Sequence, residues 1–284
     1  MNLLIGGTGF IGTPLSQALA DRGKPVVSLN RSGKGTVAGV EYISHDLGGN
    51  TVPSSLLDQA TNIFVLSGQI GPDFDPIRER HILEQLLKRL STGTQRIFFC
   101  STALVYGNCT VPANETTPCK PLGAYPRFKV AAEQLVRQYI PEFRRSILRL
   151  SNIYGTPKNR GFIGHAIQAL LDTEPRPLTL NGNGQLARDY IFIDDVIRAM
   201  IRIMDSPNGT ETINIATGTS HTLQAVVDEL SIVGDKQLPY TVTSEMPDEA
   251  TAVLISNQRF QQLYGPLPFT SLHDGLRQTL DRYR

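Results

Sequence analysis

The chain has 284 residues, of which 40% are hydrophobic and 19% charged, and its formal net charge is +1. This length can form one large α/β domain with a smaller lobe, and so small a net charge gives no reason to expect nucleic acid as a partner. No apolar stretch reaches the roughly 18 residues that span a bilayer, so we expect no membrane insertion. The chain has three cysteines without metal-type spacing, and we expect no leader ahead of the first predicted strand. We therefore expect no metal site and a cytoplasmic protein.

The first predicted strand, Leu3–Ile5, leads directly into a glycine-rich turn. The turn has the pattern Gly-x-Gly-x-x-Gly over residues 7–12, and a helix is predicted over Thr13–Asp21. Glycines allow a tight turn and a close approach to phosphate, and a helix N-terminus offers free N–H groups with partial positive charge. The short pattern recurs by chance, and an ordinary glycine-rich turn is the alternative. Its place between strand and helix nevertheless predicts a dinucleotide pyrophosphate site. The expected contacts are Gly6, Gly9, Phe10, Ile11 and Gly12.

Apolar runs then alternate with amphipathic segments along the first 150 residues. Strands are predicted at Pro25–Leu29, Glu41–Ile43, Ile63–Leu66, Arg96–Cys100 and Ser146–Leu150. Between them, helices are predicted over Arg78–Leu90 and Lys129–Tyr139, each with one apolar face. Continuous apolar strands separated by helices predict a doubly wound parallel sheet of the α/β class, covered by helices on both faces. In such a sheet, ligands bind beyond the carboxyl ends of the strands.

The residues that follow the second strand bear on the choice of dinucleotide. An acidic residue there usually accepts the ribose hydroxyls of NAD, whereas this chain has Asn30, Arg31 and Ser32, with Lys34 nearby. A guanidinium and a hydroxyl suit a 2′-phosphate, so the sequence favours NADP over NAD. In the alternative interpretation, Arg31 and Lys34 are merely solvated and Asn30 holds the ribose of NAD.

The ends of the third and fourth strands add further expected cofactor contacts. Asp46 and Leu47 follow the third strand, and Leu66 and Ser67 close the fourth. The Asp46 carboxylate can accept a hydrogen bond from the adenine amino group, or alternatively it caps the segment that follows. Small residues after Leu66 leave space for the cofactor.

A candidate for proton transfer lies beyond the fifth strand, where Ser101 and Thr102 are followed further on by Tyr125 and Lys129. The last two are four residues apart, so on a helix they share a face. A free tyrosine is a poor base at neutral pH, but a nearby ammonium and an oxidised nicotinamide favour the phenolate. Tyr125 then exchanges a proton with a sugar hydroxyl while hydride moves to or from the nicotinamide. Thr102 would orient the reacting oxygen, and Lys129 would also hold the nicotinamide ribose.

Beyond Asn152 the alternation of strands and helices loosens. Strands are predicted at Tyr190–Ile193, Thr212–Ile215 and Tyr240–Val242, and helices at Thr222–Leu230 and Leu272–Tyr283. We therefore expect a dinucleotide-binding Rossmann domain formed by residues 1–151 and 189–217. A smaller α/β substrate-binding lobe is expected from residues 152–188 and 218–284.

Together these motifs resemble the extended short-chain dehydrogenase/reductase family, in particular its NAD-dependent epimerase/dehydratase group, which acts on nucleotide sugars. The resemblance rests on GGTGFIG (6–12), STALVYG (101–107), AYPRFKVAAEQLV (124–136), RLSNIYG (149–155), LTLNGNGQLARDYIFIDDVIRA (178–199) and NIATG (214–218). It implies Tyr125 as the acid/base, Lys129 as its electrostatic partner and Thr102 as the orienting hydroxyl. It also implies Asn152 and Arg188 near the substrate diphosphate or nucleotide, and a homodimer formed through helices of the first domain.

Two departures from the family pattern affect these expectations. Ala103 and Leu104 stand where members that dehydrate the sugar usually carry an acidic residue, so elimination and decarboxylation lose their expected acid and base. Pro126 restricts the residue before it to extended geometry. The sequence therefore predicts Tyr125 at the N-cap of its helix rather than within it.

The expected function is an NAD(P)-dependent epimerase of a nucleotide-diphosphate sugar. An NADPH-dependent nucleotide-sugar ketoreductase is the alternative, favoured by the missing carboxylate after the second strand. A non-catalytic NADPH-binding regulator belongs to another class, and the presence of Thr102, Tyr125 and Lys129 argues against it. Arg188 suits a diphosphate, although it can instead pair with Asp189 or Asp194.

Overall fold

The computed structural model describes residues 1–49, 51–68, 74–158, 161–174, 177–207, 209–246 and 250–284. These residues fall into two compact units. Unit 1 contains residues 1–102, 124–149 and 200–213, and unit 2 contains residues 103–123, 150–199 and 214–284. Residues 103–123 thus group with unit 2, and the assignment of one ligand to each unit stays a prediction.

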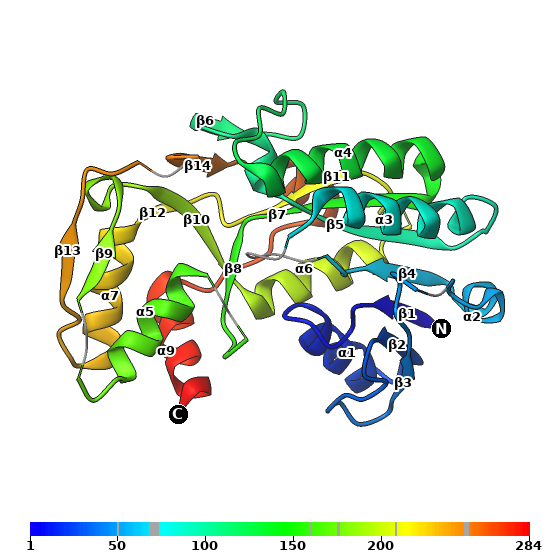
Figure 1. Ribbon diagram of the computed structural model, residues 1–284, viewed down its shortest axis with the longest axis horizontal. Coiled ribbons are helices and arrows are strands. Elements are labelled where there is room, and N and C mark those ends of the chain that lie inside the picture. Colours follow the sequence, from blue (N-terminus) through cyan, green and yellow to red (C-terminus); the bar gives the residue numbers. More distant parts are fainter. Residues whose placement is uncertain (50, 69–73, 159–160, 175–176, 208, 247–249) are drawn as a thin grey trace. The chain divides into compact units, whose positions relative to one another are not determined.

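A seven-stranded parallel sheet runs through unit 1 and confirms the expected fold class (Figure 1). The strand order is β11-β7-β5-β4-β1-β2-β3. The register places Leu3 opposite Val27 on one side and Ile63 on the other, so apolar side chains meet across neighbouring strands. The strands are β1 (Asn2–Ile5), β2 (Val26–Asn30), β3 (Val40–Ser44), β4 (Asn62–Val65), β5 (Arg96–Thr102), β7 (Arg145–Leu150) and β11 (Thr212–Ile215).

Helices α3 (Pro76–Leu90) and α4 (Ala124–Tyr139) lie side by side and pack on the sheet (Figure 1). Leu83 and Leu87 of α3 and Val136 of α4 belong to one buried cluster with residues of β1 and β4. Asp75 caps α3, because its carboxylate accepts hydrogen bonds from the backbone N–H groups of residues 77 and 78. The other helices that contain unit 1 residues are α1 (Gly12–Asp21), α2 (Ser54–Gln59) and α6 (Ile193–Asp205).

The start of α4 differs from the expected one. The helix begins at Ala124, so Tyr125 lies inside its first turn and the prediction of an N-cap position was wrong. Pro126 is tolerated there because N–H groups of the first turn have no partner within the helix, and the missing N–H of proline costs no helical hydrogen bond. Tyr125 and Lys129 are therefore both helical.

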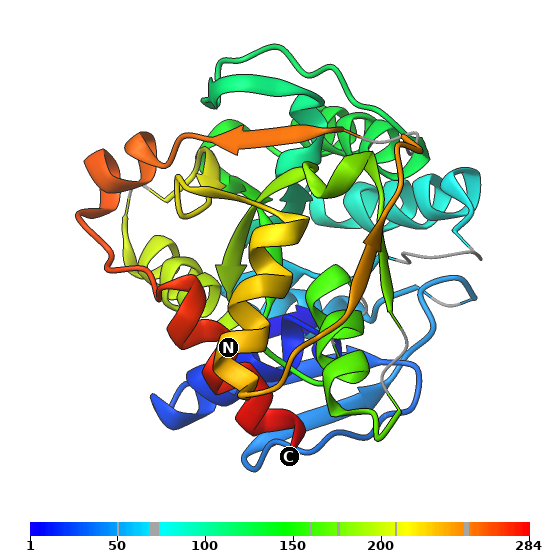
Figure 2. The same ribbon diagram turned by 90° about the vertical axis from the view of Figure 1, so that its left-hand side faces the viewer.

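Unit 2 is built around a five-stranded sheet in the order β12-β10-β14-β6, with β8 also paired to β10. The strands are β6 (Cys109–Ala113), β8 (Asn152–Tyr154), β10 (Ala187–Phe192), β12 (Ser220–Thr222) and β14 (Ala252–Ile255). A separate parallel pair joins β9 (Leu178–Leu180) to β13 (Tyr240–Val242). Figure 2 shows α7 (Leu223–Gly234) beside α9 (Leu272–Tyr283) and α5 (Phe162–Leu171). Helix α8 (Gln258–Tyr264) follows β14.

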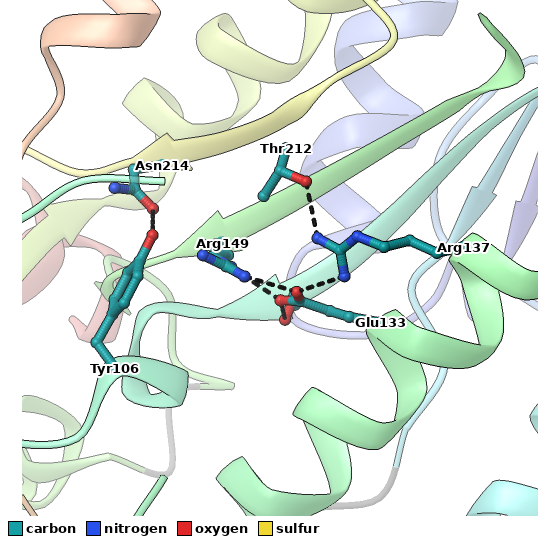
Figure 3. A network of polar contacts seen from close by, with 7 residues as sticks. Tyr106, Glu133, Arg137, Arg149, Thr212 and Asn214 are labelled. Atoms are coloured by element: carbon teal, nitrogen blue, oxygen red, sulfur yellow. Dashed lines mark hydrogen bonds and ion pairs between the residues drawn. The ribbon is translucent and has the colours of Figure 1, made fainter. Parts of the chain in front are cut away.

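A buried hydrogen-bond pair explains why residues 103–123 belong to unit 2. The Tyr106 hydroxyl donates to Asn214 Oδ1 at 2.7 Å (Figure 3), and the Asn214 amide donates to the carbonyls of Ala113 and Ser256. Buried polar groups of this kind need partners. The segment that follows β5 is therefore held by the C-terminal part of the chain. Across the described ranges, no helix combines the length and apolar character needed to cross a membrane.

Candidate active site

The glycine-rich turn packs directly against the loop that follows β4. Gly6 has a φ of +92°, and a Cβ there would lie 3.0 Å from the backbone nitrogen of Ser67. A Cβ on Gly12 would lie 2.5 Å from the carbonyl oxygen of Gly6. These two positions therefore require glycine, because any side chain would push the turn away from its neighbours.

Helix α1 begins in this turn with its positive end uncompensated. Among the described residues, no side chain caps its N-terminus at Ile11, and its first turn carries no acidic residue. Such a helix end suits an anion. A Cβ on Gly9 would make one tight contact, 3.2 Å from the carbonyl oxygen of Gly6, and would meet no other described atom within 4 Å. The predicted contacts Phe10 and Ile11 lie between Gly9 and the helix, and the turn fits a dinucleotide pyrophosphate.

Replacing Gly9 by Ala is expected to preserve the fold and weaken cofactor binding. The added methyl group occupies the open side of the turn, where the backbone must approach the pyrophosphate. The dissociation constant for NAD(P) should rise about tenfold or more, the cost of one or two charge-assisted hydrogen bonds. Calorimetric titration measures this change. In the comparison variant Gly12→Ala, the added Cβ would lie much closer to the backbone, 2.5 Å from the carbonyl oxygen of Gly6, so this change should lower the melting temperature. Unchanged cofactor affinity in Gly9→Ala would contradict the assigned site.

The end of β2 presents hydrogen-bond donors rather than acceptors. Asn30 Oδ1 accepts hydrogen bonds from the Ser32 backbone N–H at 3.0 Å and from the Ser32 hydroxyl at 2.8 Å. This fixes the amide orientation, and the buried Asn30 Nδ2 has no hydrogen-bond partner within the described part of the chain. Arg31 and Lys34 are exposed beside it. An orphaned donor next to two cations fits a ligand that carries acceptor oxygens.

Three of the predicted contacts, Leu47, Ser67 and Lys129, come together at a small cavity in unit 1. The cavity is lined by Leu47 after β3, Ser67 after β4, Phe99 on β5 and Lys129 on α4. Asp46 accepts a hydrogen bond from the backbone N–H of Gly48 at 3.1 Å, as its capping interpretation requires. Its carboxylate is exposed, and Leu66 lies one residue beyond β4. The carboxyl edge of the sheet therefore gathers the expected cofactor contacts.

The Tyr125–Lys129 pair is formed within α4 and is held against β5. Lys129 Nζ donates to the Cys100 carbonyl at 2.8 Å and lies 5.7 Å from the ring centroid of Tyr125. The ring of Phe74 packs edge-on against Tyr125, at 5.9 Å between centroids. Thr102 is the last residue of β5, two residues beyond Cys100, and its side chain is largely buried.

Burial sets the ionisation of this pair in the ligand-free protein. It raises the pKa of Tyr125 well above its ordinary value, and it lowers the pKa of Lys129 against the effect of Cys100, Glu79 and Glu133. The phenol is therefore neutral at working pH and needs a further positive charge to act as a base. Burial also raises the pKa of the Cys100 thiol to about 12, so this thiol stays protonated.

The two predicted substrate contacts lie in unit 2, on neighbouring strands. Asn152 begins β8 and is in register with Tyr190 of β10. Arg188 lies on β10, is 5% exposed, and donates to the Ala187 carbonyl at 3.0 Å. The carboxylates named as its alternative partners have other contacts. Asp189 accepts from Thr217 and Gly218, and Asp194 pairs with Arg282 at 2.7 Å.

Sequence reasoning missed one polar residue of α4. Glu133 lies four residues after Lys129, is 2% exposed, and its carboxylate contacts both β5 and β7. The signal was present in the sequence, because a carboxylate on the buried face of an amphipathic helix requires partners. Within the described ranges, no group of three or more His, Cys, Asp or Glu side chains is arranged to hold a metal ion.

Comparisons with known proteins show which family the chain is similar to. The model of the NAD dependent epimerase/dehydratase family matches residues 2–216. The chain is 28% identical to a UDP-glucose 4-epimerase of Azospirillum brasilense, covering 96% of this chain and 89% of that protein. It is 24% identical to a dTDP-4-dehydro-6-deoxyglucose reductase of Escherichia coli, and the match covers 99% of this chain and 97% of that protein. The crystal structure of UDP-glucuronic acid 4-epimerase from Bacillus cereus, with UDP-glucuronic acid and NAD, is similar with a TM-score of 0.88 at 25% identity, covering 99% and 98%.

Proposed function

The chain belongs to the NAD-dependent epimerase/dehydratase family, and from this we propose that it is an NAD(P)-dependent epimerase of a nucleotide-diphosphate sugar. The observation that carries the proposal is the Lys129 ammonium held at the Cys100 carbonyl beside the Tyr125 ring. A regulator that only binds the cofactor has no need of this pair. The two 4-epimerases to which the chain is similar support the reaction class.

Each residue then has a defined task. A bound nicotinamide supplies the hydride acceptor and donor. Tyr125 accepts the proton of the sugar hydroxyl and later returns it, and Lys129 stabilises the phenolate that forms in between. Thr102 orients the reacting oxygen by hydrogen bonding. The glycine-rich turn binds the pyrophosphate with backbone N–H groups, and Asp46, Leu47, Leu66 and Ser67 contact the rest of the dinucleotide.

A nucleotide-sugar ketoreductase is the second candidate, and the end of β2 favours it. The cofactor is NAD or NADP, and structures similar to this chain contain NAD. We propose a preference for NADP, because Asn30 Nδ2 and Arg31 offer donors where a carboxylate would repel a 2′-phosphate. Reductases consume NADPH once per turnover, whereas epimerases recycle their hydride. The E. coli relative shows that reductases occur among similar proteins.

Replacing Asn30 by Asp is expected to reverse the cofactor preference. The carboxylate accepts the ribose hydroxyls of NADH and repels the 2′-phosphate of NADPH, so the ratio of the two dissociation constants should change about tenfold or more. Titration of nicotinamide fluorescence measures both affinities, and the chain contains no tryptophan to interfere. If the wild-type protein already prefers NADH, the proposed preference for NADP is wrong.

Arg188 is proposed to bind the substrate diphosphate. Replacing it by Ala should raise KM for a nucleotide sugar by about tenfold or more, the worth of a charge-assisted hydrogen bond, while kcat changes less. Asn152 on the neighbouring strand β8 is proposed to contact the same substrate. Steady-state kinetics with a nucleotide sugar tests this. An unchanged KM in the Arg188→Ala variant would favour a small ketone without a diphosphate as the substrate.

The deciding experiment combines two measurements on the purified protein. Mass spectrometry identifies any dinucleotide released on denaturation, and NMR follows UDP-glucose and UDP-glucuronic acid for conversion to their 4-epimers. Conversion without net cofactor consumption supports the epimerase. Stoichiometric oxidation of NADPH by a keto-sugar nucleotide, without epimer formation, supports the ketoreductase. Cofactor binding without either reaction supports the regulator and overturns the enzyme.

Two further expectations stay predictions. The family resemblance implies a homodimer formed through helices of the first domain. Gel filtration with light scattering tests it, and a monomer would contradict it. The cytoplasmic location rests on the small number of cysteines in the chain, and cell fractionation tests it.

A further inference from the structure

Helix α4 carries a third polar side chain in line with Tyr125 and Lys129. Glu133 follows Lys129 by four residues, as Lys129 follows Tyr125, so the three are neighbours along one side of the helix. Both Lys129 and Glu133 are at least 95% buried. The proposed reaction assigns tasks to Tyr125 and Lys129 but none to Glu133.

The Glu133 carboxylate uses all of its accepting capacity on fixed partners (Figure 3). Oε1 accepts from the Ser101 hydroxyl at 2.6 Å and from Arg149 Nε at 3.0 Å. Oε2 accepts from Arg149 Nη2 at 2.8 Å and from Arg137 Nη1 at 3.1 Å. A carboxylate has about four lone-pair sites, and the Arg149 contact is the bidentate kind that fixes direction as well as distance. Glu133 is therefore held in one orientation.

Stability alone does not account for such a cluster. Arg149 is only 5% exposed and Glu133 2%, and a buried ion pair is often no more stabilising than apolar residues of the same volume. Burial by itself would raise the pKa of Glu133, yet the hydrogen bonds and charge of Arg149, with Ser101 and Arg137, hold this pKa below its ordinary value. The Glu133 carboxylate is thus ionised. Compared with an apolar side chain, its hydrogen bonds fix the position of α4 relative to β5 and β7.

These hydrogen bonds connect α4 to β5, the strand that ends in Thr102. Two consecutive residues of β5 hold α4: the Cys100 carbonyl accepts from Lys129, and the Ser101 hydroxyl donates to Glu133. Arg149 extends the same anchor to β7, which is adjacent to β5 in the sheet. Helix α4, which carries Tyr125, is therefore attached to β5 at two successive helical turns. The two strand residues that hold it come directly before Thr102, the residue proposed to orient the substrate.

We propose that Glu133, anchored by Ser101 and Arg149, is a positioning residue that sets the placement of Tyr125 and Lys129 relative to Thr102. The proposal rests on the proposed function in so far as Tyr125 is the acid/base. Misplacement of a reacting group by about 1 Å can cost about 100-fold in rate. Glu133 acts through Lys129 and Tyr125 and contacts no substrate itself.

Two variants test this without changing net charge. Ser101→Ala removes the hydrogen bond from the strand to Glu133. Glu133→Leu combined with Arg149→Met removes both members of the buried pair, so no lone buried charge is left to unfold the protein. Glu84→Gln is the matched control. Glu84 also contacts α4, because it accepts a 2.9 Å hydrogen bond from the Tyr139 hydroxyl. Tyr139 is the last residue of α4, at the opposite end of the helix from Tyr125. Thermal melting confirms that each variant is folded.

Two readouts are compared among the folded variants. The first is kcat and KM with a nucleotide sugar. The second is the titration of the Tyr125 phenol in the NAD⁺-loaded protein, followed by NMR of ring-labelled tyrosine. The chain has nine tyrosines, so the Tyr125 signal is assigned by its loss in Tyr125→Phe. The second readout requires no substrate, so it remains valid if the wild type converts no nucleotide sugar and the proposed function fails.

We expect both test variants to lose about tenfold or more in kcat with KM within about twofold of the wild-type value. We also expect the Tyr125 titration to move up by about one pH unit, because Lys129 no longer stabilises the phenolate as well. Glu84→Gln should match the wild type in both. If the test variants are folded and keep the wild-type kcat, or if Tyr125 titrates unchanged, Glu133 is only structural and the proposal is overturned.

Discussion

Replacing Tyr125 by Phe is expected to lower kcat by about 10²–10⁴-fold, the usual worth of a positioned proton donor and acceptor. The ring that packs against Phe74 is retained, and Lys129 keeps its hydrogen bond to the Cys100 carbonyl. The fold and cofactor affinity should therefore persist, and only proton transfer is lost. Steady-state kinetics and NAD(P) titration of the same preparation separate the two effects.

The matched control is Tyr139→Phe, on the same helix. Its hydroxyl donates to Glu84 at 2.9 Å and lies outside the candidate site. Loss of this one hydrogen bond should reduce stability only slightly and leave kcat close to the wild-type value. Retention of more than a tenth of the wild-type kcat by Tyr125→Phe would overturn the acid/base role.

The pH dependence of kcat follows from the ionisation of Tyr125. Burial raises its pKa in the ligand-free protein, so the phenolate that accepts the proton is scarce until positive charge gathers beside it. Lys129 already lies beside the ring, and a bound oxidised nicotinamide would add the further positive charge. In the oxidative direction, kcat should therefore rise with pH up to the apparent pKa of the loaded enzyme. The residual activity of Tyr125→Phe should lack this dependence.

The sheet of unit 1 was predictable because its strands are continuous apolar runs. Leu3–Ile5 and Ile63–Leu66 match β1 and β4 to within a residue at each end, since side chains buried on both faces leave a clear pattern. The carboxyl edge of a parallel sheet then places the ligand contacts without further information. The position of Tyr125 was misjudged, because the rule for the residue before proline is weaker than the tolerance of proline in a first helical turn.

Long-range pairing was not predictable from local sequence. No strand is predicted within residues 103–123, yet β6 pairs with β14, more than 130 residues away in the chain, and the Tyr106 hydroxyl donates a hydrogen bond to Asn214. The orientation of the Asn30 amide depends on its contact with Ser32, which no spacing rule specifies. The role of Glu133 depends likewise on Arg149, a strand residue whose neighbours are set only by the strand order.

Replacing Arg149 by Leu is expected to destabilise the protein by about 3–5 kcal/mol, the cost of leaving one partner of a buried ion pair uncompensated. The Glu133 carboxylate keeps Ser101 and Arg137 but loses its bidentate partner, and it stays 2% exposed unless the structure opens. Urea unfolding at neutral pH measures the change. The matched control is Arg22→Leu, whose partner Asp205 lies 2.6 Å away but whose pair is 39% and 45% exposed. That loss should be at most about 1 kcal/mol.

The destabilisation by Arg149→Leu should also depend on pH in a defined direction. In the wild type the folded-state pKa of Glu133 is lowered, so its contribution to stability is present at neutral pH and is lost as the pH falls through that pKa. In the variant, burial without the arginine raises the folded-state pKa of Glu133. The buried carboxylate therefore destabilises the folded state above the ordinary pKa of a glutamate, and this destabilisation disappears when the carboxylate is protonated. The two proteins should therefore differ most at neutral pH, and least once the pH has fallen below the lowered folded-state pKa of Glu133 in the wild type. A difference independent of pH would mean that lost packing by the arginine stem, rather than the unpaired carboxylate, destabilises the variant.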